Sequence, residues 1–410
     1  MTKRRDEKMT QSPLFPPGPP LQTEQLEIIS RLPTNSQWEE ASQIVVPNYQ
    51  PDRAIREAVL AGQDEWQHIN EVLVYPASNQ LLVYLGSKQK PLPVEEALKT
   101  IGQFSASTVL TARIVLAIWQ QRRHEQRLSK NGSAAMRLDE ILAMRGVKKR
   151  TISAYPDSNQ DLTYTIGYRP EDKQAILADL AILQQCIVRG ECTIIVQGKW
   201  QSFSVDDEYL RSSIVYRNTR RGREIAGIFV SAGDWINLYE DHSSIFLAAV
   251  EQKVFHLNPH DEQHELRLAL YLTERWREQA RQQDYDETIS MQELLEASVI
   301  PIDKKHAYRF IPRIEDALHQ LHIKGILGAE AQCLNPADRT RPRWTKEWLV
   351  SRWILLPPEN VRNHYRTTIT TPVPALPAPE GRSTTRKKVA RSSSGEISTQ
   401  ASHPKDISSS

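Results

Sequence analysis

Apolar side chains recur at helical spacing in two places that lie about 140–150 residues apart in the chain. The first such helix opens at Pro170, and its apolar face consists of Ile176, Leu180, Leu183 and Ile187. The second covers residues 312–322, and its apolar face consists of Ile314, Ala317, Leu318 and Leu321. Because this offset is too long for a solenoid repeat, it indicates two copies of one domain.

Each of these helices follows a longer helix and a short one. In the first copy, the pattern predicts a helix over residues 107–127 and a short amphipathic helix over residues 137–146. In the second copy, it predicts a helix over residues 265–279 and a short helix over residues 291–297. A capping box at residues 290–293 opens that last helix, because Ser and Glu at this spacing satisfy each other's backbone N–H groups.

Short strands follow the third helix of each copy. In the first copy they are predicted over residues 192–196, 213–216 and 228–231, and in the second copy over residues 326–327. The order of helix, short helix, helix and β-ribbon is typical of a winged helix-turn-helix. The sequence therefore predicts an α+β fold with two winged helix-turn-helix domains in tandem.

Further elements precede the first copy. Two apolar runs over residues 72–75 and 81–85 predict a β-hairpin, and Pro93 and Gly102 bound a predicted helix over residues 94–101. Pro-rich and Ser/Thr-rich ends have too few apolar residues for a core. The predicted organisation is a disordered N-terminal tail over 1–35, an extension with the hairpin over 36–104, a first winged-helix domain over 105–233, a second over 234–360 and a disordered basic tail over 361–410.

The cysteine content and the lengths of the apolar runs indicate the cellular compartment. The 410 residues include three cysteines, Cys186, Cys192 and Cys333, which cannot form a disulfide framework and point to a reducing compartment. No apolar run reaches the roughly 20 residues that span a bilayer, and the charged N-terminus has no apolar segment of a signal peptide. We therefore expect a cytoplasmic protein that does not use a membrane.

Motifs for catalysis are scarce. The sequence has no G-x-x-x-x-G-K-[ST] and no G-x-G-x-x-G, so the common nucleotide-binding loops are excluded. His256, His260 and His264 are spaced by four, but Pro259 interrupts any helix that would place them on one face. The acidic pairs Asp206-Asp207 and Asp284/Asp286 lie in loop-like segments. We predict no enzyme, no catalytic or metal site and no cofactor.

Three tryptophans share a basic segment near residue 350. Trp344, Trp348 and Trp353 lie at i, i+4 and i+9 in RPRWTKEWLVSRW. Aromatic and basic residues interleaved in this way can stack on bases. The spacing favours instead a helix whose tryptophans pack on the second domain, with the folded region ending at residues 355–358.

Charge is segregated although the net charge is only +2. Residues 21–72 hold nine acidic and three basic residues, and residues 261–296 hold ten acidic and four basic ones. Residues 113–150 hold ten basic and three acidic residues, and residues 211–223 hold five arginines and no acid. We expect localised basic faces on two small domains, with acidic faces turned elsewhere.

The basic clusters coincide with positions at which a winged helix contacts DNA, namely the start of the third helix and the wing. Arginine suits such contacts because its planar fork bonds guanine or phosphate bidentately. The candidate DNA-binding residues are Lys148, Lys149, Arg150, Arg169, Lys173, Arg217, Arg220, Arg221, Arg223, Lys304, Lys305, Arg309 and Arg313. A solvated charged face is the alternative for each cluster taken singly.

The arrangement resembles the tandem winged-helix replication initiators of bacterial plasmids. The resembling segments are TARIVLAIWQQRR, LDEILAMRG and YRPEDKQAILADLAIL in the first half, and HELRLALYLTERWREQA, MQELLEASVI and RFIPRIEDALHQLHIKGIL in the second. A predicted inserted hairpin over 152–155 and 162–166, and the long segment 197–212, depart from the family's compact pattern.

The resemblance implies a bacterial protein, associated with the nucleoid or a plasmid, that binds double-stranded DNA at repeated origin sites. It also implies melting of nearby DNA, recruitment of host helicase and polymerase machinery, and a homodimer through the first winged-helix domain. A winged-helix transcriptional regulator and a non-catalytic protein-interaction scaffold are the alternative functions. Two winged helices in one chain favour the initiator, because many regulators use one such domain and dimerise.

Overall fold

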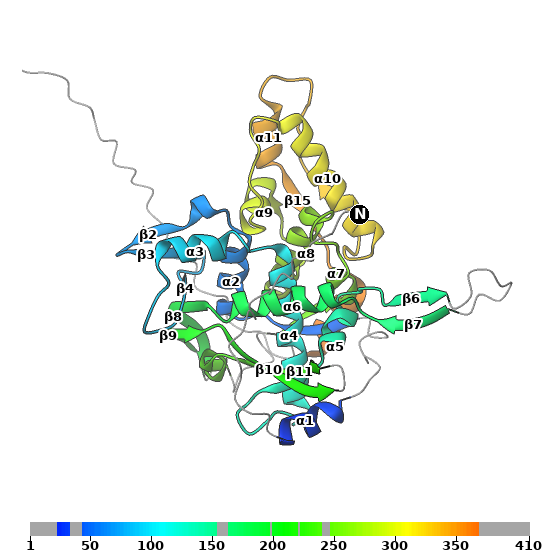
Figure 1. The fold of residues 1–410 in the computed structure, drawn as a ribbon. Helices are drawn as coiled ribbons and strands as arrows, with labels where there is room; N and C mark the ends of the chain where they lie inside the picture. The colour runs from blue at the N-terminus through cyan, green and yellow to red at the C-terminus, as the bar shows by residue number, and fades with distance from the viewer. Residues whose placement is uncertain are drawn as a thin grey trace, which may run out of the picture. The chain divides into compact units, whose positions relative to one another are not determined.

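The computed structural model describes residues 23–32, 43–153, 163–196, 199–219, 222–239 and 247–368. These residues form a mixed α/β fold (Figure 1), in agreement with the α+β class predicted from the sequence. Their helices are α1 (Thr23–Ser30), α2 (Gln50–Leu60), the 3-10 turn η1 (Gln63–Glu65), α3 (Val94–Ile101), α4 (Ala106–His124), α5 (Leu138–Met144), α6 (Pro170–Leu183), α7 (Gln252–Phe255), α8 (Gln263–Gln282), α9 (Met291–Ala297), α10 (Ala307–Ile323), α11 (Trp344–Val350) and α12 (Glu359–Thr368).

The strands pair into antiparallel sheets of two to five strands. They are β1 (Gln43–Pro47), β2 (Gln67–Ile69), β3 (Val72–Pro76), β4 (Leu82–Leu85), β5 (Ala134–Met136), β6 (Arg150–Ser153), β7 (Thr163–Gly167), β8 (Cys186–Val196), β9 (Lys199–Glu208), β10 (Leu210–Thr219), β11 (Gly222–Ala232), β12 (Leu247–Glu251), β13 (Ile289–Ser290), β14 (Gln332–Cys333) and β15 (Arg352–Ile354). The predicted hairpin before the first copy is confirmed as β3 and β4, and the predicted helix that follows it as α3.

Two segments of the chain share one order of connections. The first repeat, defined here as residues 106–232, contains α4, β5, α5, α6, β10 and β11 in that order. The second repeat, residues 263–354, contains α8, β13, α9, α10, β14 and β15, with α11 between its last two strands. The sheet orders also match, because β10-β11-β5 and β14-β15-β13 both place the last strand between the other two.

The first repeat carries two inserted hairpins. One is β6 with β7, between α5 and α6, which confirms the insertion predicted from the sequence. The other is β8 with β9, and β8 pairs with β4 in the sheet of order β2-β3-β4-β8-β9. The prediction that residues 192–196 belong to the ribbon of residues 213–216 and 228–231 is therefore wrong, because these residues pair with residues 199–203 of β9 in the inserted hairpin.

Three expectations for the second repeat are corrected. Residues 326–327 are buried but form no strand, and the strand comes later at β14. The third helix begins at Ala307 and not at Pro312, because Asp303 accepts hydrogen bonds from the backbone N–H groups of Lys305 and His306 and so organises an earlier start. Trp353 lies in β15, so the predicted tryptophan helix covers only Trp344 and Trp348.

Part of the predicted N-terminal tail is a helix. Ile29 of α1 is 3% exposed and packs with Ala135, Val215 and Phe229 on the first repeat's sheet. The guanidinium of Arg137 donates a hydrogen bond to the Ile29 carbonyl at 3.0 Å. The apolar positions of this short helix are spaced for one-sided packing, which the Pro-rich segment before it obscures. Residues 1–22 and 33–35 of the predicted tail lie outside the described ranges.

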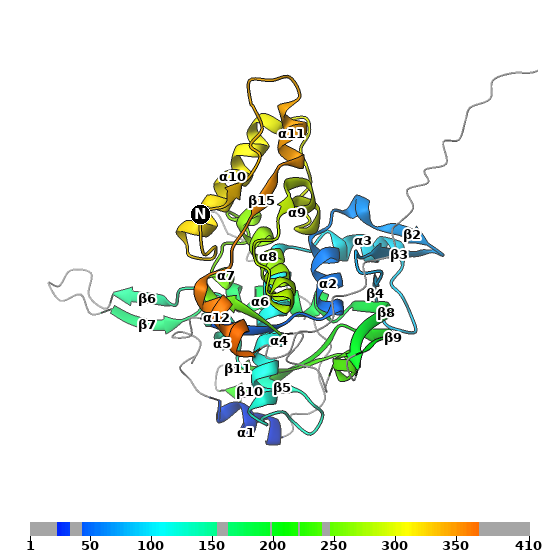
Figure 2. The same cartoon turned by 180° about the vertical axis from the view of Figure 1, so that it is seen from behind.

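The folded region also extends past residue 358. Helix α12 packs against β12 and α8 (Figure 2), with Val361 and Tyr365 buried. The Tyr365 hydroxyl accepts a hydrogen bond from the backbone N–H of Ala249 at 2.9 Å. The predicted start of the C-terminal tail at residue 361 is therefore wrong, and the rest of that tail, with its basic run, lies outside the described residues.

Candidate nucleic-acid interface

The predicted cations of the first repeat lie at the base of the β6–β7 hairpin. Lys148, Lys149, Arg150 and Arg169 are exposed and line one hollow of about 460 Å³, together with the single acid Asp172. These residues flank the hairpin, because α5 ends a few residues before Lys148 and α6 begins directly after Arg169. Four cations around one carboxylate give this hollow an excess of positive charge.

Two of the other predicted cations of the first repeat, Lys173 and Arg217, pair with carboxylates. The Lys173 ammonium lies 2.6 Å from Asp139, and the Arg217 guanidinium lies 3.3 Å from Glu224. Arg223 stacks over Tyr216, 4.0 Å from the ring centroid. These three cations line a second hollow of about 890 Å³ beside α1. Arg220 and Arg221 lie outside the described residues.

The second repeat presents its cations at the start of α10. Lys304, Lys305, Arg309 and Arg313 are exposed, and the Arg309 guanidinium lies 5.3 Å from the centroid of its neighbour Tyr308. Within the described ranges, none of these four cations has a carboxylate partner. Their full charge therefore faces solvent, unlike that of Lys173 and Arg217.

The start of α10 is held by Asp303. Its carboxylate accepts from the backbone N–H groups of Lys305 and His306 at 3.0 and 2.9 Å, and one oxygen lies 3.0 Å from Nδ1 of His306. The backbone N–H of His306 is the main cause that holds the pKa of Asp303 below its usual range. An ionised Asp303 thus orders the segment that carries the exposed cations.

Side-chain hydrogen bonds hold both third helices, and those of the first repeat are the more buried. Asp179 of α6 is 6% exposed and accepts hydrogen bonds from the hydroxyls of Ser107, Thr108 and Thr111 on α4, at 2.9, 2.8 and 2.7 Å. In the second repeat, the indole N–H of Trp348 donates to Glu315 of α10 at 3.0 Å. In each repeat a carboxylate of the third helix therefore accepts a hydrogen bond from a neighbouring helix.

The sequence reasoning missed basic residues between β14 and β15. Arg341, Arg343 and Lys346 are exposed, and Arg343 has a positive φ of 70° at the start of α11. Arg341 pairs with Asp338 at 3.0 Å. This connection is topologically equivalent to the β10–β11 turn, which the sequence did single out. The available signal is the spacing of basic residues in RPRWTK, a segment for which the tryptophan spacing favours a packed helix.

Several arginines of the predicted basic blocks face the interior or other acids. Arg113 and Arg122 are 4% and 1% exposed and pair with Glu274 and Glu140 respectively. Arg211 pairs with Asp234, Glu208 and Asp207. Part of the positive charge counted in the basic blocks 113–150 and 211–223 is therefore neutralised by ion pairs within the fold. The cations available on the surface are fewer than the sequence count indicates.

The three histidines spaced by four in the sequence do not share one helix in the structure. His256 and His260 are exposed before α8, whereas His264 lies on α8 with its ring 6.2 Å from that of Phe310. Among the described residues, no group of three or more His, Cys, Asp or Glu side chains is placed to hold a metal ion.

Among the described residues, no single helix is long and apolar enough to cross a membrane. Helices α3 and α4 together are long and apolar enough, but the chain bends by 84° between them.

The chain matches no known protein-family model, and no curated protein matches it. Solved structures that it resembles include a selenomethionine derivative of domains 2 and 3 of RctB, with a TM-score of 0.40 and 11% identity over 74% of this chain and 97% of that one. A second crystal structure of RctB domains 2–3 gives a TM-score of 0.39 and 10% identity over 76% and 99%. Similarity at this level carries over no function.

Proposed function

We propose that the chain binds double-stranded DNA sequence-specifically through two winged helix-turn-helix domains, formed by the first and second repeats. The observation that carries this proposal is the shared connection and sheet order of the repeats, each with exposed cations at the start of its third helix. In such a domain the third helix enters the major groove with its N-terminal residues toward base edges.

The side-chain chemistry supports this role. Exposed Lys and Arg bind phosphates, and an arginine on the outer face of the third helix can bond guanine O6 and N7 bidentately. Arg309 and Arg313 are placed for such contacts on α10, while Lys304 and Lys305 precede the helix. In the first repeat, Arg169 and the cations at 148–150 occupy the equivalent place beside α6.

We further propose that the protein is a bacterial plasmid replication initiator that binds repeated origin sites. It acts without a catalytic step, a metal or a cofactor, in the cytoplasm. Host helicase or polymerase machinery and a second copy of the chain, joined through the first domain, are its proposed protein partners. Two such domains in one chain support initiation over transcriptional regulation, because many regulators carry one and dimerise.

The decisive experiment measures binding to a randomised duplex library at several salt concentrations, followed by footprinting and permanganate reactivity on selected sites. We expect a steep loss of affinity with salt, protection of direct repeats and reactive thymines nearby. Protection of a promoter palindrome without strand opening would support the transcriptional regulator instead. A nearly flat salt response with no sequence preference would remove DNA binding and leave the interaction scaffold.

A further inference from the structure

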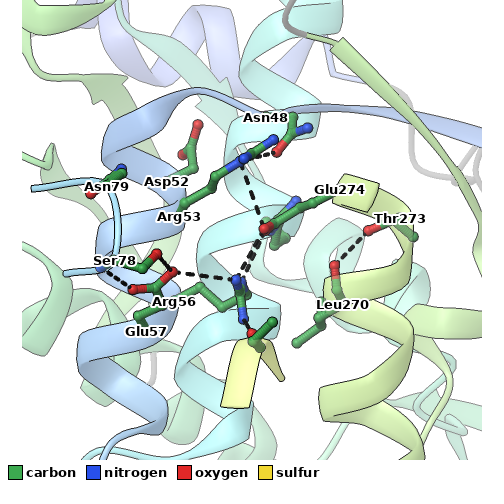
Figure 3. A network of polar contacts seen from close by, with 12 residues as sticks. Asn48, Asp52, Arg53, Arg56, Glu57, Ser78, Asn79, Leu270, Thr273 and Glu274 are labelled. Carbon is green, nitrogen blue, oxygen red and sulfur yellow. Dashed lines mark hydrogen bonds and ion pairs between the residues drawn. The ribbon is translucent and has the colours of Figure 1, made fainter. Parts of the chain in front are cut away.

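Helix α2, outside both repeats, contacts each of them through neighbouring residues. Figure 3 shows Arg53 and Arg56 of α2 directed toward Glu274 of α8, the first helix of the second repeat. On another side of α2, Asp52 accepts a hydrogen bond from the hydroxyl of Tyr209, at the start of β10 in the first repeat, at 2.9 Å. A single turn of helix therefore joins the two repeats.

Glu274 is the centre of this junction. Its side chain is 3% exposed, and both of its oxygens accept hydrogen bonds from Arg56, at 3.0 Å each. Arg113, on α4 of the first repeat, donates to the same carboxylate, and Arg53 lies 3.8 Å away. One buried glutamate of the second repeat thus receives guanidinium groups from α2 and from α4 of the first repeat.

The arginines are themselves fixed by the rest of the fold. Arg56 also donates to the carbonyl of Ala297 at the end of α9, at 3.0 Å. Its neighbour Glu57 accepts from the backbone N–H of Ser78 at 2.7 Å, which ties α2 to the β3–β4 turn. Sliding one repeat past the other would separate the Glu274 carboxylate from the guanidinium groups of Arg56 and Arg113.

A buried ion cluster of this kind adds little stability relative to a well-packed apolar substitute, but it strongly disfavours alternative arrangements that leave a charge unpaired. Its consequence is geometric. Because α4 and α8 carry the third helices α6 and α10 of their repeats, a junction with one allowed arrangement holds these two helices at one separation and orientation.

We infer that Glu274 is a positioning residue that fixes the spacing of the two DNA-contacting helices, so that one chain reads a composite DNA site of one length. This inference rests on the proposed DNA-binding function and deepens it. The glutamate touches no DNA; it acts through Arg56 and Arg113 on the placement of the repeats.

The test uses the full-length chain and fluorescent duplexes that carry the site protected by the wild-type protein. About 2, 5 or 10 base pairs are inserted between the segments protected by the two repeats, and 5 base pairs rotate one segment by roughly half a turn. We expect the wild-type protein to lose about tenfold or more in affinity on insertion. Glu274→Gln leaves Arg56 and Arg113 facing a neutral amide, and we expect it to lose about threefold or less, because its repeats bind as tethered modules.

Glu278→Gln is the matched control, since Glu278 lies one turn further along α8, pairs with Arg53 and is 41% exposed. We expect this variant to keep the wild-type dependence on spacing. Arg56→Lys, which keeps the charge but loses the bidentate fork, provides a second, milder disruption if Glu274→Gln fails to fold, and we expect it to relax the spacing dependence in the same direction.

The outcomes separate the two proposals. A DNA-binding Glu274→Gln or Arg56→Lys protein with the wild-type spacing dependence would overturn the positioning role alone. A wild-type protein that tolerates every insertion would overturn the fixed junction while leaving DNA binding intact. A wild-type protein that binds no duplex from the library would overturn the proposed function, and the positioning role with it.

Discussion

The pKa values of two buried carboxylates, Asp52 of α2 and Glu274 of α8, shift in opposite directions. Burial raises the pKa of Glu274, but the nearby Arg56, Arg113 and Arg53 together bring it below its usual range. Burial is also the largest influence on Asp52, where one hydroxyl, one backbone N–H and the more remote Arg113 do not compensate, and its pKa rises to about 6. The difference lies in the number of guanidinium groups that touch each carboxylate.

The raised pKa of Asp52 predicts a specific pH dependence of stability. The folded state holds the proton more tightly than the unfolded chain, so this stabilisation is full below pH 3.8 and is lost as the pH rises through about 6. The loss corresponds to roughly 3 kcal/mol. Urea unfolding between about pH 4 and 7 should show Asp52→Asn gaining stability relative to wild type as the pH rises. A difference that is constant over this range would contradict the prediction.

Arg313 provides a residue-scale prediction for DNA binding. It is exposed on α10 and has no carboxylate partner among the described residues. If it contacts a base, Arg313→Ala should weaken binding by about 1–3 kcal/mol and relax selectivity at one position of the site, as measured by fluorescence anisotropy with a sequence library. A loss that is uniform over all sequences would assign it to a phosphate.

The matched control for Arg313 is Arg339→Ala. Arg339 also carries an exposed guanidinium in the second repeat, but Glu315 already neutralises it. We expect it to change DNA affinity by less than about 1 kcal/mol. Equal affinities for the wild type, Arg313→Ala and Arg309→Ala would mean that the outer face of α10 does not contact DNA.

At the scale of elements, α6 depends on a single buried acceptor. Asp179→Ala would leave the hydroxyls of Ser107, Thr108 and Thr111 without their partner, and we expect it to lower the free energy of unfolding by about 3 kcal/mol. Asp179→Asn retains an acceptor and should cost less. Urea unfolding checks both, with the exposed Glu171→Ala on the same helix as control. Similar stabilities for all three variants would contradict the anchoring role of Asp179.

Local patterns predicted the elements whose signals are local. The apolar spacing of α10, the capping box at Ser290 and the proline that opens α6 all lie within a few residues and need no knowledge of distant contacts. The pairing of β8 with β4 joins residues about 100 positions apart, such as Leu82 and Arg189. The local periodicity of the sequence does not predict this pairing. Short helices α1 and α12 were missed for a related reason, because their packing partners are remote in sequence.

The cations of the candidate interface also divide into those that cluster in the sequence and those that only the fold brings into place. Lys304, Lys305, Arg309 and Arg313 were identified because they cluster in the sequence at a recognisable helix start. The exposed Arg341 and Arg343 were not, because only the pairing of β14 with β15 shows that they lie in a turn equivalent to β10–β11. Pattern alone also could not tell that Lys173 faces Asp139.

At the scale of the whole molecule, the opposed charge blocks partly neutralise one another inside the fold. Arg113 of a basic block and Glu274 of an acidic block are 161 residues apart in sequence, yet they form a buried pair. Arg56, one of the three basic residues of the acidic block 21–72, lies 218 residues from Glu274 and also pairs with it. The expectation that acidic faces turn away from basic ones is therefore incomplete, because part of each block is interior and never reaches a face.

Seven candidate cations that are exposed and have no carboxylate partner among the described residues predict the salt dependence of DNA binding. If each of Lys148, Arg150, Arg169, Lys304, Lys305, Arg309 and Arg313 meets one phosphate, the slope of log affinity against log salt concentration approaches about −6. Converting Lys304 and Lys305 to glutamine should make it shallower by about 2. Arg211→Gln should leave the slope unchanged, because Asp234 and Glu208 already hold that guanidinium.

The comparison of these variants separates local from global electrostatics. All of them remove positive charge from a chain whose net charge is only +2, so a model in which net charge governs binding predicts the same change per charge removed. Counterion release from phosphates depends instead on the cations that touch DNA. An equal effect per charge at Arg211 and at Lys304 and Lys305 would therefore contradict the localised interface, whereas a change confined to the lysines requires it.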